Sequence, residues 1–214
     1  LATTENVFIG FDSGGGSWTG TLSQKNIAVG NSTLTGAMDN ANHNIAVGHQ
    51  ALNGLTTGDG NVSIGGGSGY YVTDVDNLVL IGKDAGGAIN NAAADGTVAI
   101  GGAALSALTS GEKNVAIGFE ALKAENDGDY NVAIGYQSLL VQAGTTGEVG
   151  NTAVGWATGI AMDKGRYNTI VGQRALYKDD NGDFSTAIGY NTMFHQETGG
   201  GSNVSTRNTG LGAY

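Results

Sequence analysis

Asn114-Val115-Ala116-Ile117-Gly118 is the fullest form of a five-residue phrase that recurs twelve times along the chain. Successive copies begin 17 to 23 residues apart, and 17 is the commonest spacing. A steady period of this length indicates stacked, similar units rather than one globular core. The copies begin at Asn6, Asn26, Asn44, Asn61, Leu78, Thr97, Asn114, Asn131, Asn151, Asn168, Ser185 and Asn208.

The phrase is short, rich in β-branched residues and closed by Gly, which is typical of a β-strand that ends in a turn. The extra residues of the longer repeats fall in Gly-rich loops, outside the phrase. We therefore predict an all-β fold, a parallel β-solenoid (β-roll) of about twelve short coils with a period near 17 residues. One such domain fills residues 1–214 and forms a rod about 55–60 Å long.

The two faces of the predicted strand differ in composition. Side chains alternate between faces, so the second and fourth positions of the phrase share one face. The fourth is always aliphatic, and the second is Val or Ile in eight copies and Thr in the last four. We expect this face to form the core of each coil. The third position is mostly Ala, with Phe8, Leu80 and Ile170 as large exceptions, so we expect that face to be buried too. A second layer of the same chain or, as we favour, a neighbouring subunit would cover it.

A looser pattern follows the phrase. The third residue after its Gly is always small, and the fourth is Leu or Met in seven of eleven copies and Gly in four. Leu at this place would fill the coil from the side opposite the strand. After Gly69 and Gly159 the next residues are Tyr70 and Ile160, which suggests a bulge that moves the filling side chain along by one.

Asn opens nine of the twelve phrases, and the amides of stacked Asn residues can form hydrogen bonds with the repeats above and below. We expect a structural ladder of amides in preference to a ligand site made by the same residues. Its members are Asn6, Asn26, Asn44, Asn61, Asn114, Asn131, Asn151, Asn168 and Asn208.

Composition excludes several classes of protein. The net charge of −10 disfavours nucleic-acid binding, and no apolar run is long enough for a membrane span. Cysteine is absent, which removes disulfides, thiolate metal sites and a Cys nucleophile. We identify no catalytic residues and expect no enzyme activity and no cofactor. Because the chain starts at Leu1 without Met and its last repeat breaks off at Tyr214, we expect it to be a fragment of a longer chain.

Asn131-Val132-Ala133-Ile134-Gly135-Tyr136-Gln137-Ser138-Leu139 resembles the Asn-Thr-Ala-Ile-Gly-Tyr-x-Ala-Leu repeats of phage tail fibres and of related surface proteins that end in an endosialidase-type chaperone domain. More distantly, the phrase resembles the β-roll head of trimeric autotransporter adhesins, whose period is shorter. The resemblance covers the whole chain. It implies a homotrimer, intertwined or side by side, and it implies no catalytic residues.

Two groups of residues are candidates for ligand binding. Aromatic residues follow the phrase Gly in neighbouring coils, where they would stack and offer rings to sugars or, alternatively, pack against one another or a neighbouring subunit. Acidic loops are candidates for Ca²⁺, although we favour solvated turns as their explanation. The candidate glycan-binding residues are Phe119, Tyr136, Trp156 and Tyr190, and the candidate calcium ligands are Asp127, Asp129, Asp179, Asp180 and Asp183.

These observations predict a structural and adhesive segment of a phage tail fibre or similar appendage, located on a virion or another extracellular surface. Its partners would be two further copies of itself and a host-surface glycan or protein receptor. A bacterial trimeric adhesin head is the first alternative, and a polysaccharide-degrading tailspike with paired acids in a groove is the second.

Overall fold

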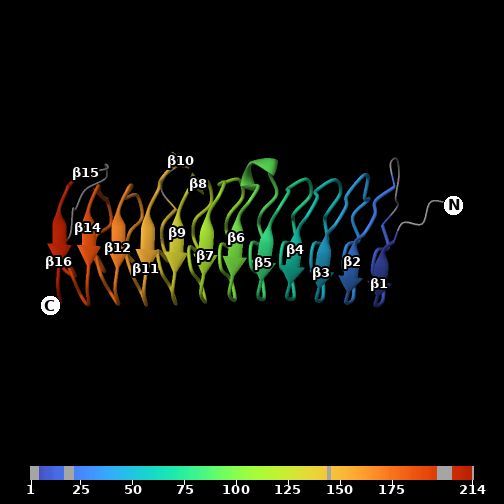
Figure 1. The fold of residues 1–214 in the computed structure, drawn as a ribbon, viewed down its shortest axis with the longest axis horizontal. Helices are drawn as coiled ribbons and strands as arrows, with labels where there is room; N and C mark the ends of the chain where they lie inside the picture. Colours follow the sequence, from blue (N-terminus) through green and yellow to red (C-terminus); the bar gives the residue numbers. More distant parts are fainter. Residues whose placement is uncertain (1–4, 17–21, 144–145, 197–203, 214) are drawn as a thin grey trace.

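The computed structural model describes residues 5–16, 22–143, 146–196 and 204–213. They form a long rod in which each repeat adds one short strand to a twelve-stranded parallel sheet, and the first and last strands lie at opposite ends of the rod (Figure 1). The predicted all-β parallel β-solenoid with a period near 17 residues is confirmed. The strands of this sheet are β1 (Val7–Ile9), β2 (Ile27–Val29), β3 (Ile45–Val47), β4 (Val62–Ile64), β5 (Val79–Ile81), β6 (Val98–Ile100), β7 (Val115–Ile117), β9 (Val132–Ile134), β11 (Thr152–Val154), β12 (Thr169–Val171), β14 (Thr186–Ile188) and β16 (Thr209–Leu211).

The smaller elements all lie in loops that connect these strands. Strand β8 (Gly128–Asp129) pairs with β10 (Gly147–Glu148), and β13 (Gly182–Asp183) pairs with β15 (Val204–Ser205). A 3-10 helix, η1 (Ala92–Ala94), occupies one longer loop. Within the described ranges there is no helix long and apolar enough to cross a membrane.

The register of the main sheet is constant along the rod. Every strand pairs in parallel with its neighbours, and each phrase position lies beside the same position of the next repeat, as Val98 beside Val115. The register holds where the repeat is longer, as from β1 to β2, where Val7 lies beside Ile27. Insertions therefore lengthen loops without displacing a strand. We call one strand with its following loop a rung.

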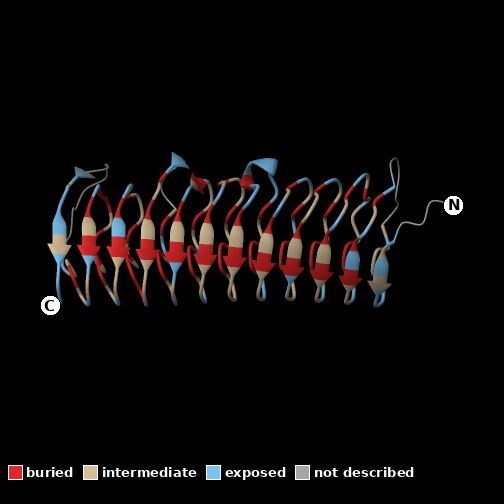
Figure 2. Cartoon of the chain, in the orientation of Figure 1, coloured by how far each residue is buried: buried red, intermediate tan, exposed pale blue. Residues whose placement is uncertain are grey.

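The structure reverses the predicted roles of the two strand faces. The third residue of the phrase, as in Ala99 and Ala116, is buried in every strand except β1 and β16 at the ends of the sheet, whereas the second and fourth residues are half-buried or exposed. Figure 2 shows this alternation as a buried band across the middle of most strands. The prediction that the Val and Ile face forms the core was therefore wrong, and so was the prediction that the Ala face meets a neighbouring subunit. The Ala face forms the core because the loop after each strand folds back over this face. Leu side chains of the loop, such as Leu105 and Leu122, are fully buried between the loop and the sheet.

Core volume is balanced between the strand and the opposite wall. Where the third phrase residue is large, the wall residue opposite it is Gly: Leu80 lies against Gly69 and Gly86, and Ile170 lies against Gly159. A Cβ on Gly86 would lie 2.7 Å from Cδ2 of Leu80, so no larger residue fits there. Ala with Leu, or a large residue with Gly, thus fills the same space at close-packed density. Phe8 with Gly14 follows the same rule.

The predicted bulge at the Gly-containing repeats is therefore wrong. Tyr70 and Ile160 are only half-buried, while Leu80 and Ile170 are fully buried and occupy the space that Leu fills elsewhere. The filling side chain comes from the strand and not from a shifted loop residue.

The Gly that closes the phrase is required by the stacking of rungs. Its φ lies between +120° and +140° in all twelve copies, a region that L side chains rarely adopt. A Cβ on Gly118 would also lie 2.3 Å from the carbonyl oxygen of Gly135 in the next rung. Both backbone angle and close approach therefore demand Gly.

Candidate functional site

The outward side chains of the twelve strands form one continuous apolar surface, which we call the outer strip. It consists of the second and fourth phrase positions, where Ile64 and Ile134, for example, are more than a third exposed. The strip holds Val, Ile and Leu along its length, with Thr at the second position from β11 onward, and no charged residue. Surfaces of this kind on soluble proteins mark interaction sites.

The predicted aromatic residues lie in the column that follows the strands, at one edge of the outer strip. The rings of Phe119 and Tyr136 stack with centroids 5.5 Å apart and planes 18° from parallel. Each of these side chains is about half exposed, as are Trp156 and Tyr190. Gln173 separates Tyr190 from Trp156 in the column. Stacking covers one ring face each of Phe119 and Tyr136.

Two further aromatic pairs lie in columns that the sequence analysis did not single out. Tyr167 and Phe184, directly before β12 and β14, stack at 5.2 Å, and Tyr177 and Phe194 stack at 4.8 Å. The guanidinium of Arg174 lies 4.7 Å from the Tyr177 ring centroid and 4.6 Å from that of Phe194, which are cation–π distances. The 17-residue spacing within both pairs was the signal that could have revealed them.

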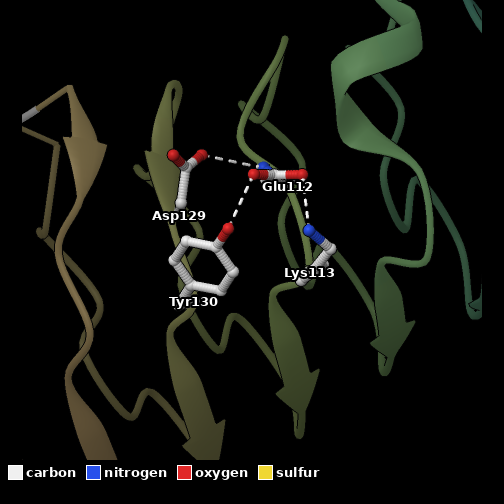
Figure 3. A network of polar contacts seen from close by, with 4 residues as sticks. All are labelled: Glu112, Lys113, Asp129 and Tyr130. Carbon is white, nitrogen blue, oxygen red and sulfur yellow. Dashed lines mark hydrogen bonds and ion pairs between the residues drawn. The ribbon is translucent and has the colours of Figure 1, made fainter.

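A polar network links the loops that precede β7 and β9 (Figure 3). Glu112 accepts hydrogen bonds from Lys113 Nζ at 2.9 Å and from the Tyr130 hydroxyl at 2.8 Å, and its backbone N–H donates to Asp129. The bond from Lys113, followed by that from Tyr130, lowers the pKa of Glu112. Glu112 therefore stays a carboxylate, whereas a general acid needs a raised pKa. These hydrogen bonds connect two successive rungs.

The asparagines that open the phrases bond from rung to rung inside the coil. Asn44 shows the pattern: its Oδ1 accepts the backbone N–H of Asn61 at 2.9 Å, and its Nδ2 donates to the carbonyl of Gly58 at 2.8 Å. Asn114, Asn151 and Asn168 repeat these bonds in their own rungs. Most ladder amides are buried and bonded to backbone, so they are not open to a ligand.

Two carboxylates, Glu125 and Asp179, lie inside the rod, and the sequence did not reveal that they are buried. Glu125 is fully buried; its Oε1 accepts the backbone N–H groups of Asn126, Asp127 and Gly128, and its Oε2 accepts from Gln142. Burial, the largest influence, raises the pKa of Glu125 against these hydrogen bonds.

Asp179 repeats this arrangement three rungs further on. Its Oδ1 accepts from the backbone of Asn181 and Gly182, and its Oδ2 accepts from Gln196 at 2.9 Å. In both places a carboxylate and an amide 17 residues later bridge adjacent rungs.

The predicted calcium ligands do not converge. Asp127 accepts from the hydroxyls of Thr109 and Ser110, whereas Asp129 and Asp183 each accept a backbone N–H from the preceding rung. The carbonyl of Asp180 accepts from two backbone N–H groups of the preceding rung, and Asp179 faces the interior. In the described part of the chain no three His, Cys, Asp or Glu residues form a group that could hold a metal ion. Calcium binding stays a prediction without a preformed ligand group there.

Comparison with protein-family models, with curated proteins and with solved structures finds no match to this chain. The fold and its surfaces therefore carry the functional argument.

Proposed function

We propose that the chain is a structural and adhesive fibre segment, in which three copies pack through their outer strips into a rigid shaft. The observation that carries this proposal is the outer strip, which spans all twelve strands of the sheet without one charged side chain. A phage tail fibre or a similar extracellular appendage is the setting we propose for it.

The size of the strip supports an extended partner. Twelve strands about 4.8 Å apart and two side-chain columns about 7 Å apart give a strip about 55 Å long and roughly 10 Å wide. That area, roughly 500 Å², is near the upper end of apolar patches on monomers, and the flanking aromatic columns enlarge it towards the 800 Å² per partner of a stable interface.

The regularity of the strip favours a second copy of the same chain. Its side chains repeat at the spacing of the strands, so an identical rod can mesh with it over the whole length. A globular partner would match only a short part of so long and narrow a surface. The number three rests on the resemblance to the repeats of phage tail fibres.

The adhesive part of the proposal concerns surfaces outside the strip. A shaft holds its loops at fixed distances from one another, and a host-surface glycan or protein receptor would contact those loops. Phe119, Tyr136, Trp156 and Tyr190, each about half exposed, stay candidates for glycan contact. With a net charge of −10, the shaft would not attract nucleic acid.

The mass of the purified chain in solution tests the assembly. We expect three times the chain mass of 21.5 kDa by multi-angle light scattering. Ile134→Lys places a charge in the strip and should dissociate the trimer, because three buried ammonium groups would lack partners. Val141→Lys is the matched control: Val141 is 40% exposed and Ile134 is 36% exposed, but Val141 lies outside the strip. A monomeric wild-type chain at micromolar concentration would overturn the proposal.

A further inference from the structure

A hollow of about 310 Å³ opens on the loops that follow β3 to β6. Its polar lining comes from Gln50, Asp84 and Ser106, and two aromatic residues, Tyr70 and Tyr71, complete the wall. These five residues come from four successive rungs, so only the stacked fold brings them together. The volume is at the lower end of those of small-molecule sites.

The hollow exists because one side chain is missing from a regular column. The second residue after the phrase Gly is Gln50, then Gly67, then Asp84 in three successive rungs. Gly67, at φ +69°, puts no side chain between the rung of Gln50 and the rung of Asp84, which are two rungs, or about 10 Å, apart. The Asp84 carboxylate reaches into this place: a Cβ on Gly67 would lie 2.5 Å from its Oδ1, so a side chain at position 67 would displace the carboxylate.

The two tyrosines form a corner whose ring faces are not stacked along the rod. Their ring centroids are 4.7 Å apart and their planes are nearly perpendicular, at 86°. The residues that correspond to Tyr71 in the neighbouring rungs are Gly54 and Ala88, so no aromatic ladder forms there. Tyr71 is 60% exposed, more than Phe119 or Tyr136, which cover each other. An uncovered ring beside hydrogen-bonding groups is a surface for a ligand with one apolar face and polar edges.

We propose that this hollow binds one neutral hexopyranose unit of a glycan. The C–H face of the sugar lies on the Tyr71 ring, and its hydroxyls bond to the Asp84 carboxylate, the Gln50 amide and Ser106. The Asp84 carboxylate, whose Oδ2 lies 3.7 Å from Lys83 Nζ, accepts hydrogen bonds from sugar hydroxyls. The hollow gives the attachment part of the proposed function a location. It is formed within one copy, so binding does not require self-association.

Saturation-transfer NMR with the methyl glycosides of glucose, galactose, mannose and N-acetylglucosamine tests the site. We expect transfer to the C–H protons of at least one sugar, and a decrease in affinity of about tenfold or more in Tyr71→Ala and in Asp84→Asn. Gly67→Asn, which tolerates the left-handed backbone, should fill the gap and abolish binding. Tyr167→Ala, at an exposed tyrosine outside the hollow and outside the candidate glycan-binding residues, is the control and should bind as the wild type does.

Three results would overturn the site. Two are no transfer to any of the four sugars, and equal transfer in Tyr71→Ala with an unchanged melting temperature. The third is equal binding of adenine, because this flat base has no hydroxyl groups to donate to the acceptors of the hollow. Light scattering on the same samples separates the two proposals. A monomer that binds sugar contradicts the shaft alone, and a trimer that binds no sugar contradicts the hollow alone.

Discussion

The two halves of the rod differ in the side chains that occupy the same interior column, which are aliphatic in one half and mostly polar in the other. The column consists of the residue seven places after each phrase Gly. In the rungs of β3 to β6 it is aliphatic, and in those of β7 to β14 it is mostly polar, yet the backbone register is the same throughout. The aliphatic members are Leu55, Val72, Ile89 and Leu108, and the later members are Glu125, Gln142, Met162, Asp179 and Gln196.

The difference teaches that the solenoid tolerates an interior carboxylate only where its hydrogen bonds are complete. Glu125 bonds to three N–H groups of its own loop and to Gln142, and Gln142 accepts in turn from Asn151 of the Asn ladder. Gln196 similarly joins Asp179 to Asn208. The polar side chains of this half thus form a hydrogen-bonded network inside the rod.

The position of these carboxylates relates to loop length. In rungs with regular neighbours the N–H groups at this turn donate to a carbonyl of the next rung, as Thr56 and Thr57 donate to Thr73. Glu125 and Asp179 each precede a rung with an extended loop, at residues 140–150 and 195–207. In these two rungs the carboxylate of Glu125 or Asp179 accepts backbone N–H groups of its own turn instead.

The largest effect should come from placing a carboxylate in the apolar half. Leu108→Glu puts a buried charge between Ile89 and Glu125, without an amide partner, and should cost at least about 4 kcal/mol of unfolding free energy. Urea unfolding at constant protein concentration measures it, because assembly also stabilises the fold. The exposed control Val141→Glu should change stability by less than about 0.5 kcal/mol. A stable Leu108→Glu chain would show that the two halves do not differ.

The pH dependence of stability should be smaller in effect and specific to the polar half. Burial raises the pKa of Glu125 above its ordinary value of 4.5, so the folded chain binds this proton more tightly than the unfolded chain does. Stability should therefore rise as pH falls through the folded-state pKa of Glu125, and this gain should be lost as pH rises again. The pKa of Asp183 is likewise raised by burial and acts in the same direction.

Melting curves between about pH 5 and pH 8 measure this dependence, above the range in which Glu112 and Glu120, whose pKa values are lowered, begin to protonate. Glu125→Gln should reduce the slope, and the slope that remains should come from Asp183. An unchanged slope in Glu125→Gln would mean that the buried carboxylate does not titrate as its surroundings imply.

The smallest effect should come from the stacked pair of Phe119 and Tyr136 in the later rungs. Tyr136→Ala should cost about 1 kcal/mol through loss of its stack with Phe119. A double-mutant cycle of Phe119→Ala and Tyr136→Ala should show coupling of about 0.5–1 kcal/mol, whereas Phe119→Ala and Phe184→Ala, in different columns, should be additive. Additivity in the first pair would remove the stack as a source of stability.

The repeat period and the fold were predictable from the phrase, but the inward direction of the strand was not. An alternating pattern shows that two faces exist without showing which one is inside. The pairing of Leu80 with Gly69 and Gly86 contained the answer, because only side chains that share a core need compensating volumes. Ala at the third position was mistaken for an interface residue since a core that narrow is unusual.

The surface sites were predictable to a lesser degree. Phe119 and Tyr136 could be placed in one column from their spacing, but which ring faces stay open depends on the neighbours of each ring. The hollow beside Tyr71 needs side chains from four rungs, and no single repeat reveals it. Glu125 looked like part of an acidic turn because its burial depends on the direction of one side chain.

The constant register has a consequence for how such a rod changes length. Each rung presents to the next the same pattern of strand, Gly and Asn that it receives, so residues 101–117 form a module whose two junctions match. Duplicating or deleting such a module would alter reach by about 4.8 Å while leaving every other contact in place. The number of phrases in the chain therefore sets the length of the rod.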